Sequence, residues 1–132
     1  MYYLDANILI EYLRNPSSNI MDSLKSIPLK NVKIPAIVKG ELMVGAHKRK
    51  NVEQSIKDVE KLTSFFEIVP FDDEASKIYG LVHAELESRG KSIGSNDLLI
   101  ASIVLSRGGI LVTDNTKEFS NIKELRLENW KK

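Results

Sequence analysis

Hydrophobic residues follow two periods along this 132-residue chain, one typical of strands and the other typical of helices. Five short runs of apolar or alternating residues predict strands, at Tyr2–Leu4, Val32–Ile34, Glu67–Phe71, Ile110–Val112 and Leu125–Leu127. Between them, apolar residues recur every three or four positions and predict six helices, over 8–13, 19–27, 35–45, 52–66, 75–86 and 97–106. Strands that alternate with helices indicate an α/β sandwich of three layers, with a central, mostly parallel sheet and helices on both faces.

Local signals mark several helix ends. Asn15-Pro16 is expected to stop the first helix, because proline disfavours a helical residue before it. Ser95-Asn96 is expected to cap the apolar helix Asp97–Ser106. Inside the third helix, Gly40 and Gly45 each cost about 1 kcal/mol relative to alanine, so we expect close packing against another element there.

The composition is that of an ordinary globular protein, with 42% hydrophobic and 28% charged residues, and its length predicts one domain over residues 1–132. The lack of cysteine excludes disulfides and thiolate chemistry and suits a reducing cytoplasm, where we expect the protein. Neither a secretory signal nor a membrane span is apparent, because the longest apolar stretch, Leu98–Leu105, is far below the ~20 residues that a span needs.

The formal net charge of +1 says little by itself. If four carboxylates bind metal, the 18 acidic residues fall to 14 against 19 basic ones, and the remaining surface becomes cationic. The basic run His47–Lys50 could contact phosphate. An equally good interpretation is a solvated helix end, where the helix dipole favours cations.

Four acidic residues occupy positions that suit chemistry. Asp5 follows the first strand, Asp114 follows the apolar strand Ile110–Val112, and Asp97 begins an apolar helix. Because the carboxyl ends of parallel strands meet at one edge of a sheet, these acids are expected there. Glu41 lies in mid-helix at the margin of an apolar face, where an unpaired charge is costly. An oxygen-only cluster of this kind suits Mg²⁺, with Mn²⁺ as a plausible substitute.

Each acid also has an ordinary interpretation. Asp5 and Asp97 could be helix-capping or first-turn acids, and Asp114 could serve a turn. Glu41 could pair with Lys39 or Lys48, or turn to water.

Other chemistries have less support. His47 and His83 lie far apart without metal-ligand spacing, and no G-x-G-x-x-G, Walker A or G-x-S-x-G motif is present. Trp130, near the carboxyl terminus, is expected to pack down the tail rather than stack on bases.

Four segments of the chain resemble PIN-domain ribonucleases, in particular the VapC toxins of bacterial toxin–antitoxin pairs. These segments are Leu4–Ile10 (LDANILI), Gly40–Leu42 (GEL), Ile93–Ala101 (IGSNDLLIA) and Leu111–Phe119 (LVTDNTKEF). The resemblance runs almost end to end and includes the closing Leu125–Trp130. It implies a PIN-like nuclease domain.

The resemblance also implies an activity and partners. It implies a magnesium-dependent endoribonuclease that hydrolyses RNA phosphodiester bonds and is inhibited by a VapB-like antitoxin. Relatives of this kind are usually homodimers, and the substrate could be a tRNA such as the initiator tRNA.

Asp5, Glu41 and Asp97 match the three firmest acids of the family. Many relatives carry the fourth acid two residues after the threonine, where this chain has Asn115, so Asp114 could bind metal directly, bind it through water, or only neighbour the true contact.

The hypothesis is that Asp5, Asp97 and Asp114 hold one Mg²⁺, while Glu41 orients a water or a second ion. Asn7, Thr113 and Asn115 would then position these ligands or the substrate as a second layer.

Three other functions remain open. The chain could be a PIN nuclease that processes RNA without an antitoxin. It could be a phosphatase with an aspartyl nucleophile, although that chemistry needs a second acid where Asn7 stands. It could also be a non-catalytic module whose acidic pocket receives a partner's Arg or Lys.

Overall fold

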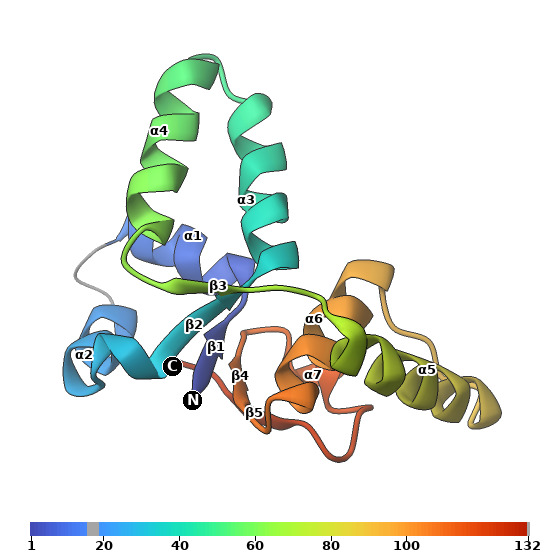
Figure 1. Cartoon of the computed structure of the whole chain (residues 1–132). Coiled ribbons are helices and arrows are strands. Elements are labelled where there is room, and N and C mark those ends of the chain that lie inside the picture. The colour runs from blue at the N-terminus through green and yellow to red at the C-terminus, as the bar shows by residue number, and fades with distance from the viewer. Residues whose placement is uncertain (16–18, 132) are drawn as a thin grey trace.

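A parallel sheet surrounded by helices forms the molecule, and the computed structural model describes residues 1–15 and 19–131 (Figure 1). The strands are β1 (Tyr2–Leu4), β2 (Val32–Pro35), β3 (Glu67–Val69), β4 (Ile110–Val112) and β5 (Arg126–Glu128). The helices are α1 (Ala6–Arg14), α2 (Asn19–Ser26), α3 (Ala36–His47), α4 (Val52–Thr63), α5 (Asp73–Ser88), α6 (Ser95–Ser106) and α7 (Thr116–Phe119). A 3₁₀ turn, η1 (Leu29–Asn31), precedes β2. The predicted α/β sandwich is confirmed.

The five strands run parallel in the order β3-β2-β1-β4-β5. β1 lies at the centre and pairs with β4 in the register Leu4 to Val112. The residues that follow these two strands, Asp5 and Thr113, therefore leave the sheet at the same edge. β3 is an edge strand that stops at Val69, as the proline after it indicated.

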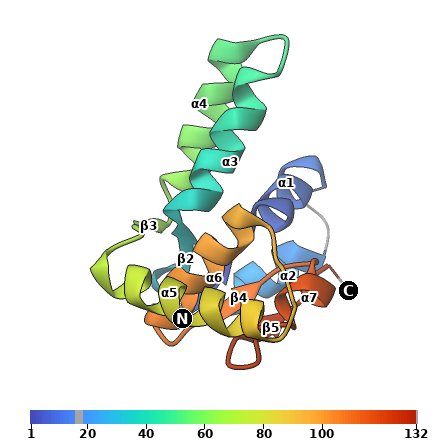
Figure 2. The same ribbon diagram turned by 90° about the vertical axis from the view of Figure 1, so that its right-hand side faces the viewer.

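The helices divide into two groups around the sheet. α3 and α4 form an antiparallel hairpin that extends away from the strands (Figures 1 and 2). α5 and α6 pack against each other beside β4 and β5 (Figure 2). α6 is apolar almost all round, and its residues Ile100–Val104 are fully buried, as expected of a helix at the core. No helix of the described ranges is both long and apolar enough to span a membrane.

Two local predictions are wrong. Gly40 and Gly45 are exposed, and a Cβ at either position would meet nothing within 4 Å, so no close packing explains them. Ser95-Asn96 does not cap α6, because the helix begins at Ser95, two residues before the expected start at Asp97. Its N-cap is Gly94, and no side chain makes a capping bond. The Gly94 carbonyl accepts from the Leu98 N–H, so the helix starts before either polar side chain could cap it.

The end of α1 agrees with the prediction as far as it is described. The helix stops at Arg14, and the N–H of Asn15 donates to the Glu11 carbonyl. Pro16, which was expected to stop this helix, lies outside the described residues.

Candidate active site

Asp5 lies at the carboxyl end of β1, and both of its carboxylate oxygens accept hydrogen bonds. Oδ1 accepts from the Ala6 N–H at 2.8 Å, and Oδ2 accepts from the Thr113 hydroxyl at 2.7 Å. Its N–H donates to the Val112 carbonyl at 2.9 Å, which continues the pairing of β1 with β4. Asp5 is thus the N-cap of α1 and is also only 6% exposed.

Burial has the largest effect on the acidity of Asp5 and raises its pKa. The bonds from Thr113 and Ala6 oppose this rise, whereas the charges of Asp114 and Glu118 add to it. A carboxylate in this position is stabilised if a cation lies nearby.

Glu41 projects from α3, and its Oε1 is buried without a hydrogen-bond partner among the residues that the structure describes. Lys39 pairs instead with Glu60 at 2.7 Å, and neither Lys39 nor Lys48 forms an ion pair with Glu41 in the described part of the chain. Burial raises the pKa of Glu41 most, the charge of Asp5 raises it further, and the Asn96 side chain lowers it. The interpretation of Glu41 as paired with Lys39 or Lys48 is therefore wrong, and one oxygen of its half-buried carboxylate is turned away from water.

Asp97 lies in the first turn of α6, and its surroundings raise its pKa to about 7. Burial is the largest cause, followed by the charges of Glu118 and Asp5 and by a hydrogen bond to Glu118. The charge of Glu41 contributes as well. Asp5, Glu41 and Asp97 therefore lie near enough to repel one another, although they come from three distant parts of the sequence.

Glu118, on α7, is a site residue that the sequence analysis did not select. Its Oε1 accepts from the Gly94 N–H at 2.6 Å, and its Oε2 accepts from the Asn115 amide at 2.8 Å. These bonds, with that of Gly94 the strongest influence, lower its pKa. The available signal was an acid one helical turn after Asn115, within the segment that carries the family resemblance. Asp5, Glu41, Asp97 and Glu118 are called the acid cluster below.

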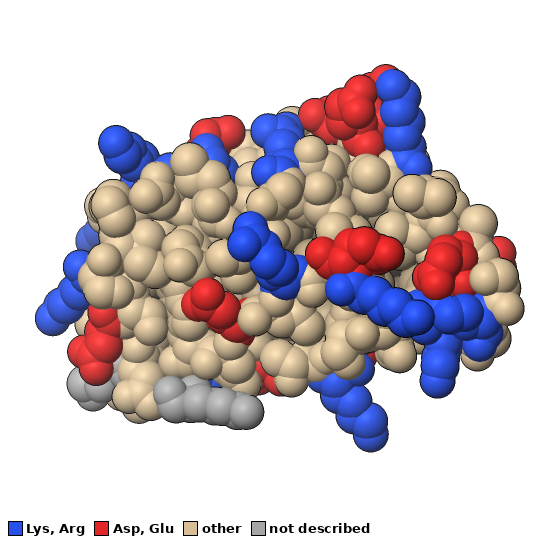
Figure 3. All heavy atoms as spheres, turned by 90° about the horizontal axis from the view of Figure 1, so that it is seen from below, with Lys and Arg blue, Asp and Glu red and all other residues tan. Residues whose placement is uncertain are grey.

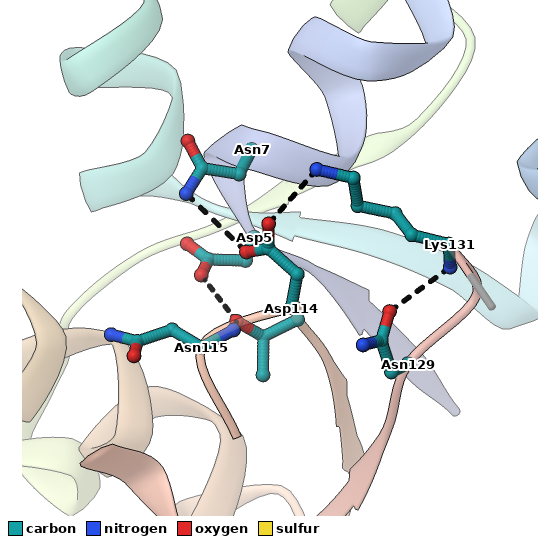
Figure 4. A network of polar contacts seen from close by, with 7 residues as sticks. Asp5, Asn7, Asp114, Asn115, Asn129 and Lys131 are labelled. Atoms are coloured by element: carbon teal, nitrogen blue, oxygen red, sulfur yellow. Dashed lines mark hydrogen bonds and ion pairs between the residues drawn. The ribbon is translucent and has the colours of Figure 1, made fainter. Parts of the chain in front are cut away.

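Asp114 lies beside this cluster but has partners of its own (Figure 4). Its Oδ2 is 2.9 Å from the Lys131 Nζ, and its Oδ1 accepts a longer bond, 3.4 Å, from the Asn7 amide. Burial raises its pKa, but the bonds from Lys131 and Asn7 outweigh burial and leave the pKa lowered. Asp114 is therefore already neutralised by a neighbouring ammonium group.

The three residues expected to form a second layer each contact an acid of this region. The buried Thr113 hydroxyl donates to Asp5 and accepts from the Asn115 N–H at 3.0 Å. The Asn115 side chain donates to Glu118, as described above.

Within residues 1–15 and 19–131, no three Asp, Glu or His side chains form a ready-made metal-binding group. The chemistry of the acid cluster nevertheless fits a hard divalent cation, because all its donors are carboxylate oxygens. Glu41 supplies a buried oxygen without a partner. A cation among these acids would offset the repulsion that raises the pKa of Asp97.

A large apolar groove, with a volume of about 1400 Å³, lies between α1, α2 and the α3–α4 hairpin. Glu41 is one of its lining residues, so the groove reaches the acid cluster. Its apolar lining includes Ile10, Leu13, Leu24, Leu29, Leu42 and Phe65.

Basic side chains surround this groove: Arg14, Lys25, Lys48, Arg49, Lys50 and Lys61. Lys48, Arg49 and Lys50 of the basic run found in the sequence thus line the groove. On the face seen from below in Figure 3, by contrast, basic and acidic side chains are intermixed.

A family model described as PIN domain matches residues 2–125. The Ribonuclease VapC2 of Rickettsia felis is 38% identical over all of this chain and 99% of its own length. The tRNA(fMet)-specific endonuclease VapC of Shigella flexneri is 31% identical over 98% of this chain and 97% of its own.

Solved structures of VapBC complexes also contain chains that are similar to this one in fold and sequence. The structure of VapBC2 from Rickettsia felis bound to a DNA fragment from its promoter contains a chain that superposes with a TM-score of 0.91 at 36% identity, covering 98% of both chains. A chain of the DNA-bound VapBC from Salmonella typhimurium superposes with a TM-score of 0.92 at 32% identity, covering 98% of this chain and 97% of the other.

Proposed function

Because this chain belongs to the PIN-domain family, and within it to the VapC ribonucleases, we propose that it is an endoribonuclease toxin neutralised by a cognate VapB-like antitoxin. It hydrolyses RNA phosphodiester bonds with the help of a divalent cation. PIN-domain nucleases generally depend on such a cation, and Mg²⁺ is the ion proposed here, with Mn²⁺ as a substitute.

The observation that carries this proposal is the mutual repulsion of acids at one edge of the sheet. The charge of Asp5 raises the pKa of Glu41, and the charges of Asp5 and Glu41 both raise the pKa of Asp97. One Glu41 oxygen is also buried without a partner among the described residues. Unpaired buried charge is costly, so such an arrangement is stable only when a cation or protons occupy it. Of these two occupants, a hard cation is the one that would also assist phosphodiester hydrolysis.

In the proposed mechanism, Asp5, Glu41, Asp97 and Glu118 would hold the cation. When bound, a divalent cation makes a water molecule more acidic and offsets the negative charge of the phosphate. Thr113 keeps the Asp5 carboxylate oriented by donating to one of its oxygens. Glu118 holds the start of α6, which carries Asp97, through its bond from the Gly94 N–H.

Glu118 replaces Asp114 in this proposed ligand set. The Asp114 carboxylate is paired with the Lys131 ammonium group, whereas Glu118 accepts from the neutral Gly94 and Asn115 donors and lies close enough to Asp97 to raise its pKa. From the sequence, Asp114 was expected to bind metal directly, to bind it through water, or to neighbour the true contact.

The direct test is incubation of the purified protein with total RNA, with and without Mg²⁺, followed by mapping of the cut ends. Asp5→Asn and Asp97→Asn should abolish cleavage and leave the fold intact. Glu53→Gln, which changes an exposed acid on α4, is the matched control and should cleave normally. Normal cleavage by either active-site variant would refute the assignment. Cuts confined to a tRNA would support the substrate class named for the Shigella relative.

The apolar groove is the proposed binding site for the antitoxin. Its open apolar floor suits an amphipathic helix, and its basic border suits acidic residues on that helix. An antitoxin seated there would reach Glu41 and block the acid cluster.

Exposed apolar side chains of the groove allow a test that spares the fold. Leu29→Ser and Phe65→Ser should weaken antitoxin binding without changing RNA cleavage, because both side chains are exposed and line the groove. Leu81→Ser changes an exposed leucine on α5 outside the groove and is the control. Equal antitoxin affinity in all three variants would place the antitoxin elsewhere.

The homodimer and the choice between the toxin and its alternatives stay predictions. The homodimer implied by the family resemblance can be tested by light scattering of the purified toxin. A nuclease that processes RNA without an antitoxin would lack an antitoxin gene beside its own. Titration with Mn²⁺ distinguishes both nucleases from a module that only binds a partner, because such a module need not bind metal.

A further inference from the structure

We propose that Lys131 is a substrate-binding residue that contacts an RNA phosphate next to the acid cluster, and that Asp114 positions its ammonium group. The inference rests on the proposed function, because it needs a phosphodiester bond close to Asp5. It assigns a role to a lysine outside the four segments that carry the acids.

The ammonium group of Lys131 lies at the edge of the cluster. Its Nζ is 2.9 Å from the Asp114 Oδ2 (Figure 4). Asp114 follows Thr113, whose hydroxyl donates to Asp5, and Asp114 also raises the pKa of Asp5. No Lys or Arg within residues 1–15 and 19–131 forms an ion pair with any of the four acids of the cluster. Lys131 is therefore a cation that lies beside the cluster, on Asp114, and is not paired with any of the four acids.

The backbone that carries Lys131 is held in place. Trp130 is only 6% exposed, its ring centroid is 5.6 Å from that of Tyr2, and its indole N–H donates to Glu128 at 2.9 Å. The Lys131 N–H donates to the Asn129 side chain at 3.0 Å. The expectation that Trp130 packs down the tail is confirmed, and its packing fixes the start of the Lys131 side chain.

The pair is also open to solvent. The side chains of Lys131 and Asp114 are 32% and 28% exposed. Their ammonium group can thus approach a phosphate without leaving Asp114, in the way that a lysine contributes a point charge to phosphate binding. Four acids repel RNA, so a fixed positive charge at their border lowers the cost of bringing the backbone close.

The simpler interpretation is an ion pair that only ties down the chain end. A partly exposed pair contributes about 0–1 kcal/mol, so its loss changes stability little. A phosphate contact has a different signature, because its loss weakens RNA binding and reduces the salt dependence of binding. The two interpretations therefore predict different measurements.

The experiment measures binding of fluorescently labelled bulk tRNA by anisotropy, in EDTA so that no cleavage occurs, between 50 and 200 mM KCl. We expect Lys131→Met to weaken binding roughly 5- to 20-fold and to reduce the salt slope by about one. Lys131→Arg should restore most of the affinity. Lys57→Met removes an exposed lysine that pairs with Glu53 on α4, and it should bind like the wild type.

Cleavage and metal binding provide separate measurements. In Mg²⁺, Lys131→Met should raise KM more than it lowers kcat. Asp114→Asn should keep the rise in Tm that Mn²⁺ causes in the wild type, because Asp114 holds Lys131 rather than the cation.

Three outcomes would overturn the inference. If Lys131→Met binds RNA with the affinity and salt slope of the wild type, the pair of Lys131 with Asp114 only ties down the chain end. Loss of the Mn²⁺ effect in Asp114→Asn would make Asp114 a metal ligand. If the wild type neither binds nor cleaves RNA, the proposed function fails together with this inference. If the wild type cleaves RNA and Lys131→Met binds RNA equally well, only the role given to Lys131 fails.

Discussion

The metal-free protein should lose stability as the pH rises, and Asp97→Asn should remove most of that loss. Burial and the charges of Glu118 and Asp5 raise the pKa of Asp97 to about 7 in the folded protein. In the unfolded chain the same carboxyl has the ordinary pKa of aspartic acid, about 3.9. Between these values the folded state keeps a proton that the unfolded state releases, so the free energy of unfolding falls from about pH 4 and levels off above about pH 7.

The size of this loss follows from the difference between the two pKa values. About three pH units correspond to roughly 4 kcal/mol at 1.36 kcal/mol per unit. Because Asp97 is only partly buried, solvent screening reduces this value, and we expect a loss of about 1–2 kcal/mol. For a chain of this length the corresponding change in Tm is about 3–8 °C.

The assay is urea unfolding in EDTA from pH 4 to pH 8, followed through the fluorescence of the single tryptophan, Trp130. An asparagine at position 97 is neutral at every pH and can still donate to Glu118, as the protonated acid does. Asp97→Asn should match the wild type near pH 4 and exceed it by about 1–2 kcal/mol at pH 8. Saturating Mg²⁺ should close that gap by stabilising only the wild type.

The matched control is Glu53→Gln, which removes one exposed carboxylate on α4. Its stability should follow the wild type across the whole pH range. Parallel pH profiles for wild type and Asp97→Asn would mean that the acids do not repel one another in the folded protein, and the argument for a cation among them would fail.

The remaining predictions concern packing and the charge of Glu118. Gly109→Ala should destabilise the protein by about 1–3 kcal/mol, because its Cβ would overlap the buried Tyr3 ring. Gly80→Ala, inside α5 with nothing within 4 Å of the new Cβ, should stabilise it by about 1 kcal/mol. In urea unfolding, a stabilised Gly109→Ala would contradict the first prediction, and a destabilised Gly80→Ala would contradict the second. Glu118→Gln should lower the pKa of Asp97 and narrow the pH range over which stability falls, and an unchanged profile would contradict the coupling.

Much of the fold could be predicted from the sequence, because burial imposes a local period. Leu111 and Val112 of β4 and residues Ile100–Val104 of α6 are fully buried in the core, as the apolar runs that contain them predict. The positions of Asp5 and Asp97 followed from the same pattern, since each stands where a strand ends or a helix begins.

The helix starts and the glycines were less predictable. Ser95 and Asn96 have good capping side chains, yet α6 begins at Ser95, with Gly94 held by Glu118 from a distant helix. Gly40 and Gly45 suggested close packing, but both face open space on α3. In these cases the deciding neighbour, or its absence, lies outside the local sequence.

The acids show most clearly what the sequence determined by itself. The pairing of β1 with β4 places the carboxylate of Asp5 at the carboxyl edge of the parallel sheet. Asp97 is expected at the same edge, because α6 leads from that edge back to the start of β4. What each carboxylate meets there was decided by side chains more than 100 residues apart, as in the bond from Thr113 to Asp5. Whether an acid repels its neighbours, like Asp97, or is neutralised by a lysine, like Asp114, depends on distances of a few ångströms that only tertiary packing sets.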